Sequence, residues 1–236
     1  MNKRAKINIA IDGPSGSGKG TTSKNLAKKL GYNYLDTGSM YRAIAFYFNQ
    51  NNIDITNLQN FDTILNSIKL DFNSQNHIML NKIDIENLIR TPKIGQLASD
   101  ISKISAIREF LTKKQKKIVE NGGYIAEGRD IGSIIMPNSE LKIYLTATID
   151  ARAKRRLLDF QKKGIEITLE EVKKQIIIRD KQDMERKLAP LVKLPDAIEV
   201  DTSNITIDEQ VDIIYKKAIK IIEKLERNFE ILNNFA

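Results

Sequence analysis

The chain has 236 residues, 41% of them hydrophobic and 29% charged, which is long enough for one sizeable core and ordinary for a soluble globular protein. It contains no cysteine, which excludes a disulfide framework, a thiolate metal site and a cysteine nucleophile. No apolar run approaches membrane-spanning length, and the first apolar stretch meets Asp12 too early for a secretory signal. We therefore expect a cytoplasmic protein with no membrane partner.

The net charge is +8, which raises the possibility of a nucleic-acid partner. No basic patch alternates with stacking aromatic residues, so we expect no such partner. The basic residues comprise 27 lysines and only 11 arginines, and arginine is the residue whose planar fork grips phosphate. Eight arginines lie in the segments described below and indicate a small, highly anionic substrate: Arg42, Arg108, Arg129, Arg152, Arg155, Arg156, Arg179 and Arg186.

Short apolar runs alternate with amphipathic stretches along most of the chain, which is typical of an α/β fold with a parallel sheet. The apolar runs predict five core strands, at residues 7–11, 32–36, 124–127, 141–147 and 198–201. The amphipathic stretches predict helices at residues 19–30, 39–49, 106–120, 151–163, 169–186 and 208–225.

Two regions interrupt this alternation. Residues 51–105 contain Asn-rich turns and short alternating runs, which predict an inserted subdomain with a small antiparallel sheet. Residues 152–192 contain two charged helices that meet at Gly164 and resemble a mobile flap more than a packed core. The second helix opens with Thr168 and Glu171, at the spacing of a capping box.

A glycine-rich turn that follows an apolar strand and opens a helix is the most specific signal in the sequence. The backbone N–H groups of such a turn face a phosphate, and the helix N-terminus adds positive potential. Lys19 can then reach the β- and γ-phosphates of ATP, while Thr21 can place its hydroxyl on the bridging Mg²⁺. The ATP-binding residues predicted here are Gly13, Pro14, Ser15, Gly16, Ser17, Gly18, Lys19, Gly20 and Thr21. Gly20 stands where many such loops have Ser or Thr, and this variant is usual among nucleoside monophosphate kinases.

A switch GTPase is the competing class, because residues 81–84 match the guanine-reading Asn-Lys-x-Asp motif. The required Asp-x-x-Gly motif does not occur between the phosphate loop and this segment. We interpret residues 81–84 as a hairpin turn.

Three further segments carry polar residues at positions suited to a second ligand. Arg42 lies in the first turn of a predicted helix, where a phosphate can bind. Arg129 and Asp130 follow a core strand at the edge where α/β sheets bind ligands, although an ion pair between the two is the structural alternative. Arg179, Asp183 and Arg186 share one helical stripe, for which the alternative is a solvated ion pair.

Residues 13–21, 35–42, 127–132 and 179–191 together resemble the bacterial cytidylate kinase family, in order and over almost the whole chain. The resemblance implies a single P-loop kinase domain at residues 1–236, with a five-stranded parallel sheet flanked by helices. It also implies an NMP-binding subdomain at residues 38–112 and a helical lid at residues 152–192. Many members of the family have Asp where this chain has Glu127.

The resemblance also implies roles for individual residues. The implied catalytic residues are Lys19, Arg129, Arg179 and Arg186, and Arg156 is implied as a lid contact to ATP. The implied CMP-binding residues are Thr37, Arg42, Arg129 and Arg179 for the phosphate, Asp183 for the ribose, and Ser99, Arg108 and Asp130 for the cytosine. Ser99 and Arg108 have the weakest local signal, because either could be plain helix surface.

The implied reaction transfers the γ-phosphoryl group of ATP to CMP or dCMP, with Mg²⁺ as cofactor and ATP and CMP or dCMP as the small-molecule partners. We expect a monomer. Another small-molecule P-loop kinase, with UMP or a different nucleoside monophosphate as acceptor, is the alternative. A nucleotide-dependent switch protein is the more distant one.

Overall fold

The computed structural model describes residues 5–56, 61–162 and 164–234. Its contacts divide the chain into two compact units. Unit 1 comprises Met1–Leu35 and Val119–Ala236, and unit 2 comprises Asp36–Ile118. The sequence predicted a subdomain at residues 38–112, which begins two residues later than unit 2 and ends six residues earlier.

The central sheet has five strands in the order β2-β6-β1-β7-β8. β1 pairs in parallel with β6 and β7, and β7 pairs in parallel with β8. The strands are β1 (Ile9–Asp12), β2 (Asn33–Asp36), β6 (Tyr124–Gly128), β7 (Leu141–Thr146) and β8 (Ile198–Asp201). The predicted α/β class with its five-stranded parallel core is confirmed, and each strand lies within two residues of its predicted bounds.

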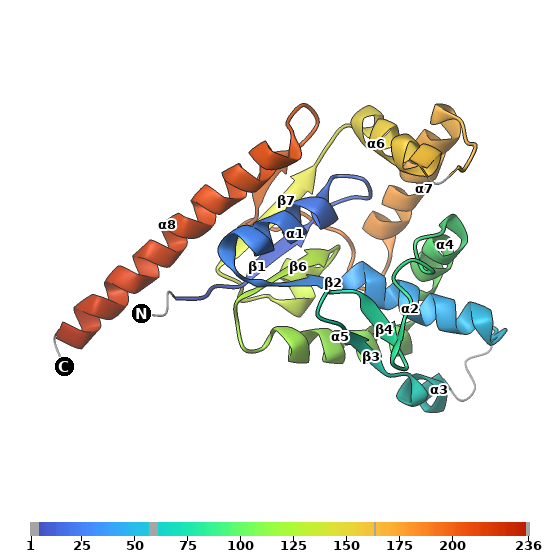
Figure 1. Cartoon of the computed structure of the whole chain (residues 1–236), viewed down its shortest axis with the longest axis horizontal. Helices are drawn as coiled ribbons and strands as arrows, with labels where there is room; N and C mark the ends of the chain where they lie inside the picture. Colours follow the sequence, from blue (N-terminus) through green and yellow to red (C-terminus); the bar gives the residue numbers. More distant parts are fainter. Residues whose placement is uncertain (1–4, 57–60, 163, 235–236) are drawn as a thin grey trace. The chain divides into compact units, whose positions relative to one another are not determined.

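One face of the sheet packs against two helices, α1 (Lys19–Leu30) and α8 (Ile207–Asn234). Ile9 and Ile11 of β1 are fully buried there with Leu26 of α1 and Ile214 of α8. Because side chains alternate along a strand, Asp12 lies on the opposite face from Ile11. Figure 1 shows α8 running along the sheet and continuing past it. The helix extends nine residues beyond its predicted end because no Gly or Pro occurs in residues 226–234.

Helices α6 (Ile149–Lys162) and α7 (Leu169–Glu185) form the charged pair expected at residues 152–192. The capping box is present, with the Thr168 and Glu171 side chains bonded to each other's backbone N–H groups. The pair encloses a small apolar cluster that includes Phe160 and Val172, so the segment has a packed core of its own, and its role as a mobile lid stays a prediction. α7 ends at Glu185 rather than at residue 186, because Arg186 has an extended backbone, with ψ of 140°.

Unit 2 contains a three-stranded antiparallel sheet in the order β3-β4-β5. Its elements are α2 (Thr37–Gln50), α3 (Phe61–Ser67), β3 (Leu70–Phe72), β4 (Ile78–Leu80), β5 (Ile83–Asp84), α4 (Pro92–Ile101) and α5 (Ser105–Val119), the last of which ends one residue past the unit. Asn81 and Lys82 have φ of 49° and 71° and join β4 to β5, so residues 81–84 comprise a two-residue hairpin turn and the strand that follows it, and the hairpin interpretation is confirmed. The sequence predicted neither α3 nor α4.

Gly13 allows the phosphate loop to leave β1 directly against β7. A Cβ at this position would lie 2.1 Å from the carbonyl oxygen of Leu145, with φ at +154°. Because the obstacle is backbone, we expect Gly13→Ala to lower the free energy of unfolding by roughly 3 kcal/mol or more. Gly31→Ala is the matched control, since Gly31 has φ of +67° and open space around it, and should cost only about 1 kcal/mol. Urea unfolding measures both, and equal losses would contradict the close approach.

Candidate functional site

Three neighbouring strands of unit 1 end at one edge of the sheet and present polar residues there. β1 ends at Asp12, which lies in register with Gly128 of β6 and Tyr144 of β7. The chain then continues into the glycine-rich loop after β1 and into Arg129 after β6. The carboxyl edge of an open parallel sheet is where α/β proteins bind ligands.

The glycine-rich loop, residues 13–18, curls around the carbonyl group of Pro14. The Lys19 ammonium donates to the Pro14 oxygen at 2.8 Å, and the Ser17 hydroxyl donates to the same oxygen at 3.0 Å. Gly18 begins α1 in the left-handed conformation, with no side-chain cap and no acidic residue in the first turn. The first N–H groups of α1 therefore face no negative side chain of their own helix and suit an anion.

Side chains from other elements of unit 1 fix this loop from outside. Arg152 of α6 donates to the Ser15 carbonyl oxygen at 3.2 Å and to the Asp180 carboxylate of α7 at 2.5 Å. Arg156 donates to the Ser15 hydroxyl at 3.3 Å, and the Thr202 hydroxyl donates to the Ser17 carbonyl oxygen at 3.0 Å. Arg152 is buried and serves as an internal support of the loop, whereas Arg156 is only partly buried.

Lys19 is almost completely buried, at 5% exposure. Burial and the nearby Arg129 charge lower the pKa of Lys19 from 10.5 to about 7. Glu127, Asp183 and Asp12 act in the opposite direction, in decreasing order. The lysine therefore lies in a dry environment where its charge acts strongly on an anion.

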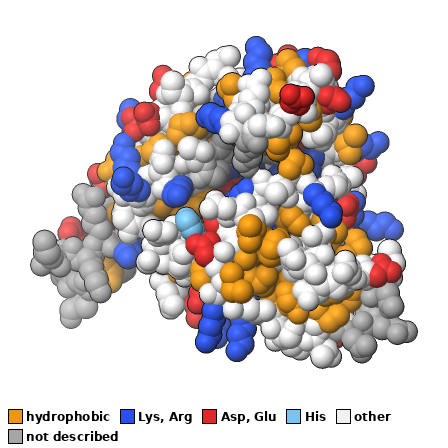
Figure 2. Space-filling view, turned by 45° about the vertical axis from the view of Figure 1, so that its right-hand side comes forward, with side chains coloured by type: hydrophobic (Ala, Val, Ile, Leu, Met, Phe, Trp, Pro, Cys, Tyr) orange, Lys and Arg blue, Asp and Glu red, His pale blue; other side chains and the backbone are white. Residues whose placement is uncertain are grey.

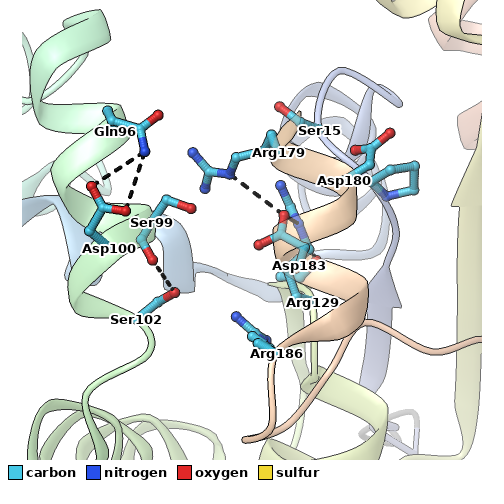
Figure 3. A network of polar contacts seen from close by, with 12 residues as sticks. Ser15, Gln96, Ser99, Asp100, Ser102, Arg129, Arg179, Asp180, Asp183 and Arg186 are labelled. Carbon is cyan, nitrogen blue, oxygen red and sulfur yellow. Dashed lines mark hydrogen bonds and ion pairs between the residues drawn. The ribbon is translucent and has the colours of Figure 1, made fainter. Parts of the chain in front are cut away.

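The arginines predicted from the second and third motifs form a cluster with two carboxylates in unit 1. Arg129 donates to Asp183 at 2.8 Å, and Arg179 lies 3.6 Å from the same carboxylate (Figure 3). Arg186 lies 3.7 Å from Asp130. Arg129 thus pairs with α7 instead of with its sequence neighbour Asp130, which was the structural alternative.

The cluster is buried, so the alternative of a solvated ion pair on α7 is wrong: the Asp183 side chain is only 4% exposed. Burial raises the pKa of Asp183, but Arg129 and Arg179 outweigh this and leave it below its usual value. The same pairing overcomes the effect of burial on Arg129 and raises its pKa. Asp183 and Arg129 are therefore held in their charged forms.

The Thr21 hydroxyl lies exposed in the first turn of α1, at the position predicted for Mg²⁺. A Cβ on Gly20 would lie 3.4 Å from the Glu127 carboxylate, so Glu127 occupies the space beside that turn. A hydroxyl and a carboxylate are oxygen donors that suit Mg²⁺ when substrate phosphates supply further ligands. The described residues contain no group of three or more His, Cys, Asp or Glu side chains able to hold a metal by themselves.

Unit 2 carries the other residues predicted to bind phosphate, Thr37 and Arg42, in the first part of α2. Thr37 is its first residue, and Asp36 caps the helix by accepting from the Ser39 N–H at 2.9 Å. The Asp36 carboxylate also accepts from Arg90 at 2.9 Å. Burial raises the pKa of Asp36, but Arg90 and Arg42 outweigh it and lower the pKa. Arg42 therefore belongs to a charged group that contains a second arginine.

Ser99 and Arg108 are both buried in unit 2, at 2% and 6% exposure, which rules out the reading of plain helix surface. The Ser99 carbonyl oxygen on α4 accepts from Ser102 at 2.7 Å, as Figure 3 shows. Arg108 donates to the Ser102 carbonyl oxygen at 3.2 Å and lies over the ring of Tyr41. The two predicted base-reading residues are thus tied to one turn of chain.

Sequence reasoning missed three residues that the structure places in these clusters: Asp12, Arg90 and Asp180. The sequence contains a signal beside Arg90, because Thr91 and Pro92, which follow it, have the pattern of a helix N-cap and first helical residue and start α4. Asp180 lies next to Arg179 and was overlooked because it belongs to another face of α7. For Asp12 the sequence indicates only the end of a strand.

The surface gives two coarser findings. In Figure 2 the lysine and arginine side chains of the described residues are dispersed over the visible face among acidic ones. Within the ranges that the structure describes, the helices are all too short or too polar to cross a membrane.

The pH dependence of stability tests the burial of Lys19. Its pKa is about 7 in the folded chain and 10.5 ordinarily, so the unfolded chain binds more protons between these values. We expect the free energy of unfolding of the ligand-free protein to rise from pH 7 to about 10, relative to Lys19→Met, which lacks this titration. Urea unfolding of both proteins across this range measures the difference. Parallel curves would contradict the lowered pKa.

Comparisons with known proteins agree on one family. The model of the cytidylate kinase family matches residues 9–220. A cytidylate kinase of Thermosipho melanesiensis is 47% identical over 88% of this chain and 94% of its own length. A cytidylate kinase of Carboxydothermus hydrogenoformans is 39% identical over 96% of this chain and 100% of its own length.

Two further matches differ more from this chain, one in its length and the other in its sequence. A bifunctional pantoate ligase/cytidylate kinase of Prochlorococcus marinus is 47% identical over 89% of this chain, which spans only 42% of that protein. Among solved structures, an uncharacterised protein of Eubacterium ventriosum shares the fold, with a TM-score of 0.54, 16% identity and coverage of 92% of this chain and 99% of its own. The family match and the full-length relatives carry the assignment: the chain belongs to the cytidylate kinase family.

Proposed function

We propose that this protein transfers the γ-phosphoryl group of ATP to CMP or dCMP and releases ADP and CDP or dCDP. The observation that carries the proposal is the largely buried set of Lys19, at the end of the glycine-rich loop, and the Arg129, Arg179 and Asp183 cluster. The cluster supplies fixed positive charge where a transferring phosphoryl group needs it, and the family assignment names the acceptor.

On the donor side, the loop residues 13–18 and the first turn of α1 bind the ATP phosphates through their N–H groups. Lys19 binds the β- and γ-phosphates, and Arg156, which contacts Ser15, adds a second cation. Thr21, with Glu127 nearby, would hold Mg²⁺, which neutralises charge on the bridged phosphates when it is bound. A ligand that enters this site replaces the Pro14 carbonyl group as the partner of Lys19.

On the acceptor side, unit 1 contributes Arg129 and Arg179 to the CMP phosphate, Asp183 to the ribose and Asp130 to the base. Asp130 can accept from the cytosine amino group, as a carboxylate does in nucleic-acid readers. From unit 2 we assign Thr37 and Arg42 to the phosphate, and Ser99 and Arg108 to the ring acceptors of the base. These eight roles are proposals.

The chemistry needs no covalent intermediate. Phosphoryl transfer depends on in-line placement of the attacking and leaving oxygens and on neutralisation of charge at the phosphoryl group. Lys19, Arg129, Arg179 and Arg186 provide that charge, and the three arginines are held by ion pairs with Asp183 and Asp130. We also propose a cytoplasmic monomer, which size-exclusion chromatography tests for the oligomeric state.

A coupled ADP-release assay with each nucleoside monophosphate in turn tests the proposed function. We expect repeated turnover with CMP and dCMP in the presence of Mg²⁺. Faster turnover with UMP or AMP would show that the acceptor is that nucleotide and not CMP. A single turnover of ATP without an acceptor would indicate a nucleotide-dependent switch instead.

Arg179→Lys should lower kcat/KM for CMP although it keeps the charge. A lysine ammonium cannot reproduce two parallel bonds to a phosphate, and one lost charge-assisted hydrogen bond corresponds to roughly a tenfold loss or more. Arg227→Lys is the matched control, because Arg227 is bonded to its own helix at Glu223, outside both proposed substrate sites. Equal effects of the two substitutions would contradict a special role for the Arg179 fork.

Asp130 should set the preference for cytosine over uracil. Uracil presents a carbonyl group where cytosine presents an amino group, so a buried carboxylate favours the first base and repels the second. We expect kcat/KM for CMP to exceed that for UMP by at least about two orders of magnitude, and Asp130→Asn to reduce the ratio mainly through loss of CMP activity. Steady-state kinetics of both proteins with both nucleotides measures the ratio, with AMP as a negative control. If CMP and UMP activity fall by one common factor, Asp130 does not read the base.

A further inference from the structure

We propose that Asp12 is a positioning residue that fixes the segment carrying Arg129 and Asp130. The inference rests on the proposed function, because its effect is expressed in acceptor binding. Asp12 is the last residue of the central strand β1 and directly precedes the glycine-rich loop. It is only 7% exposed and lies on the face of the sheet opposite to Ile11.

Both oxygens of Asp12 are used on two consecutive backbone groups. Oδ1 accepts from the Ile131 N–H at 2.8 Å, and Oδ2 accepts from the Gly132 N–H at 2.8 Å. These donors are the first two residues of the π-helical turn η1 (Ile131–Ile135). Bonds from N–H groups to a buried carboxylate are among the stronger hydrogen bonds in proteins.

The turn depends on this outside acceptor. Asp130 stands at its N-cap position, with φ of −145° and ψ of 28°, but its side chain does not cap the turn. The Asp130 carbonyl oxygen instead accepts from Ile134 at 2.9 Å. Asp12 thus takes over the capping of η1, and the Asp130 carboxylate lies 3.7 Å from Arg186. Because Asp12 caps the turn, the Asp130 side chain is not used for capping.

A carboxylate is the side chain that this geometry requires. Burial raises the pKa of Asp12 to about 6, against the effect of the two N–H bonds, so the charged group is costly here. An asparagine would be cheaper to bury, but it offers one acceptor oxygen and would turn its NH₂ group toward the second N–H donor. The acidic side chain of Asp12 is therefore needed because it can accept from two consecutive N–H groups at once.

The effect should fall on the acceptor and much less on ATP. Ile131 and Gly132 follow Asp130 directly, so a shift of the turn moves Asp130 and Arg129. Asp12 is also the weakest of the carboxylates that raise the pKa of Lys19, after Glu127 and Asp183. Removing its charge should leave the lysine and its phosphates nearly unchanged.

Asp12→Asn tests the inference. We expect KM for CMP to rise about tenfold or more, the CMP-to-UMP preference to fall by a similar factor, and KM for ATP to stay within about twofold. Ile214→Val is the control for lost stability alone, because Ile214 is fully buried in α8 and belongs to the core on the opposite face of the sheet. Thermal unfolding of both variants establishes that their stabilities are comparable.

Other outcomes would overturn the inference. If Asp12→Asn only lowers the melting temperature and its kinetics match those of Ile214→Val, Asp12 has a structural role alone. If KM for ATP rises as much as KM for CMP, Asp12 acts on the glycine-rich loop.

If Asp12→Asn does not fold, Asp12→Glu keeps both oxygens while displacing them, and it should raise KM for CMP selectively. Failure of both variants to fold would also contradict a role confined to the turn. Absence of CMP turnover in the unaltered protein would instead reject the proposed function.

Discussion

The burial of Lys19 is the constraint on which the arrangement of the site depends. An ammonium group removed from water requires polar partners, and here the Pro14 carbonyl group and nearby carboxylates replace the lost hydration. Glu127 and Asp183 raise the pKa of Lys19, so both carboxylates must lie close to it for the ammonium group to stay charged. In return the lysine charge acts through a dry medium, where it stabilises an anion far more than it could in water.

The same carboxylates organise the arginines. Asp183 holds Arg129 in unit 1, and Asp36 holds Arg90 in unit 2, each at 2.9 Å or less. A guanidinium that is already fixed by a carboxylate loses less side-chain entropy when it binds phosphate. In each unit the charges are therefore already paired and oriented before a ligand binds. The side-chain entropy of these arginines is lost during folding and not during binding.

The sequence predicts the parts of this arrangement that are local. The five strands and the glycine-rich loop follow from short apolar runs and from glycine spacing, which tertiary contacts did not override. The partner of Arg129 could not be predicted, because Asp130 is its neighbour in sequence while Asp183 lies on α7, 54 residues further along the chain. The end of α7 is a similar case: the Asp183 carbonyl oxygen accepts from the Leu191 N–H after the chain has turned, so Arg186 lies beyond the helix.

The two departures from common patterns, Gly20 and Glu127, lie side by side. A side chain at position 20 would begin 3.4 Å from the Glu127 carboxylate and 3.6 Å from the Tyr34 hydroxyl, which itself lies 3.5 Å from Glu127. Both distances from position 20 are those of ordinary van der Waals contact, so glycine brings this turn close to the acid with no side chain between them. With glycine at position 20, the hydroxyl moves to Thr21 and the space holds a negative charge instead. Among the carboxylates that act on Lys19, Glu127 raises its pKa most, so this acid beside Gly20 helps to keep the buried lysine protonated.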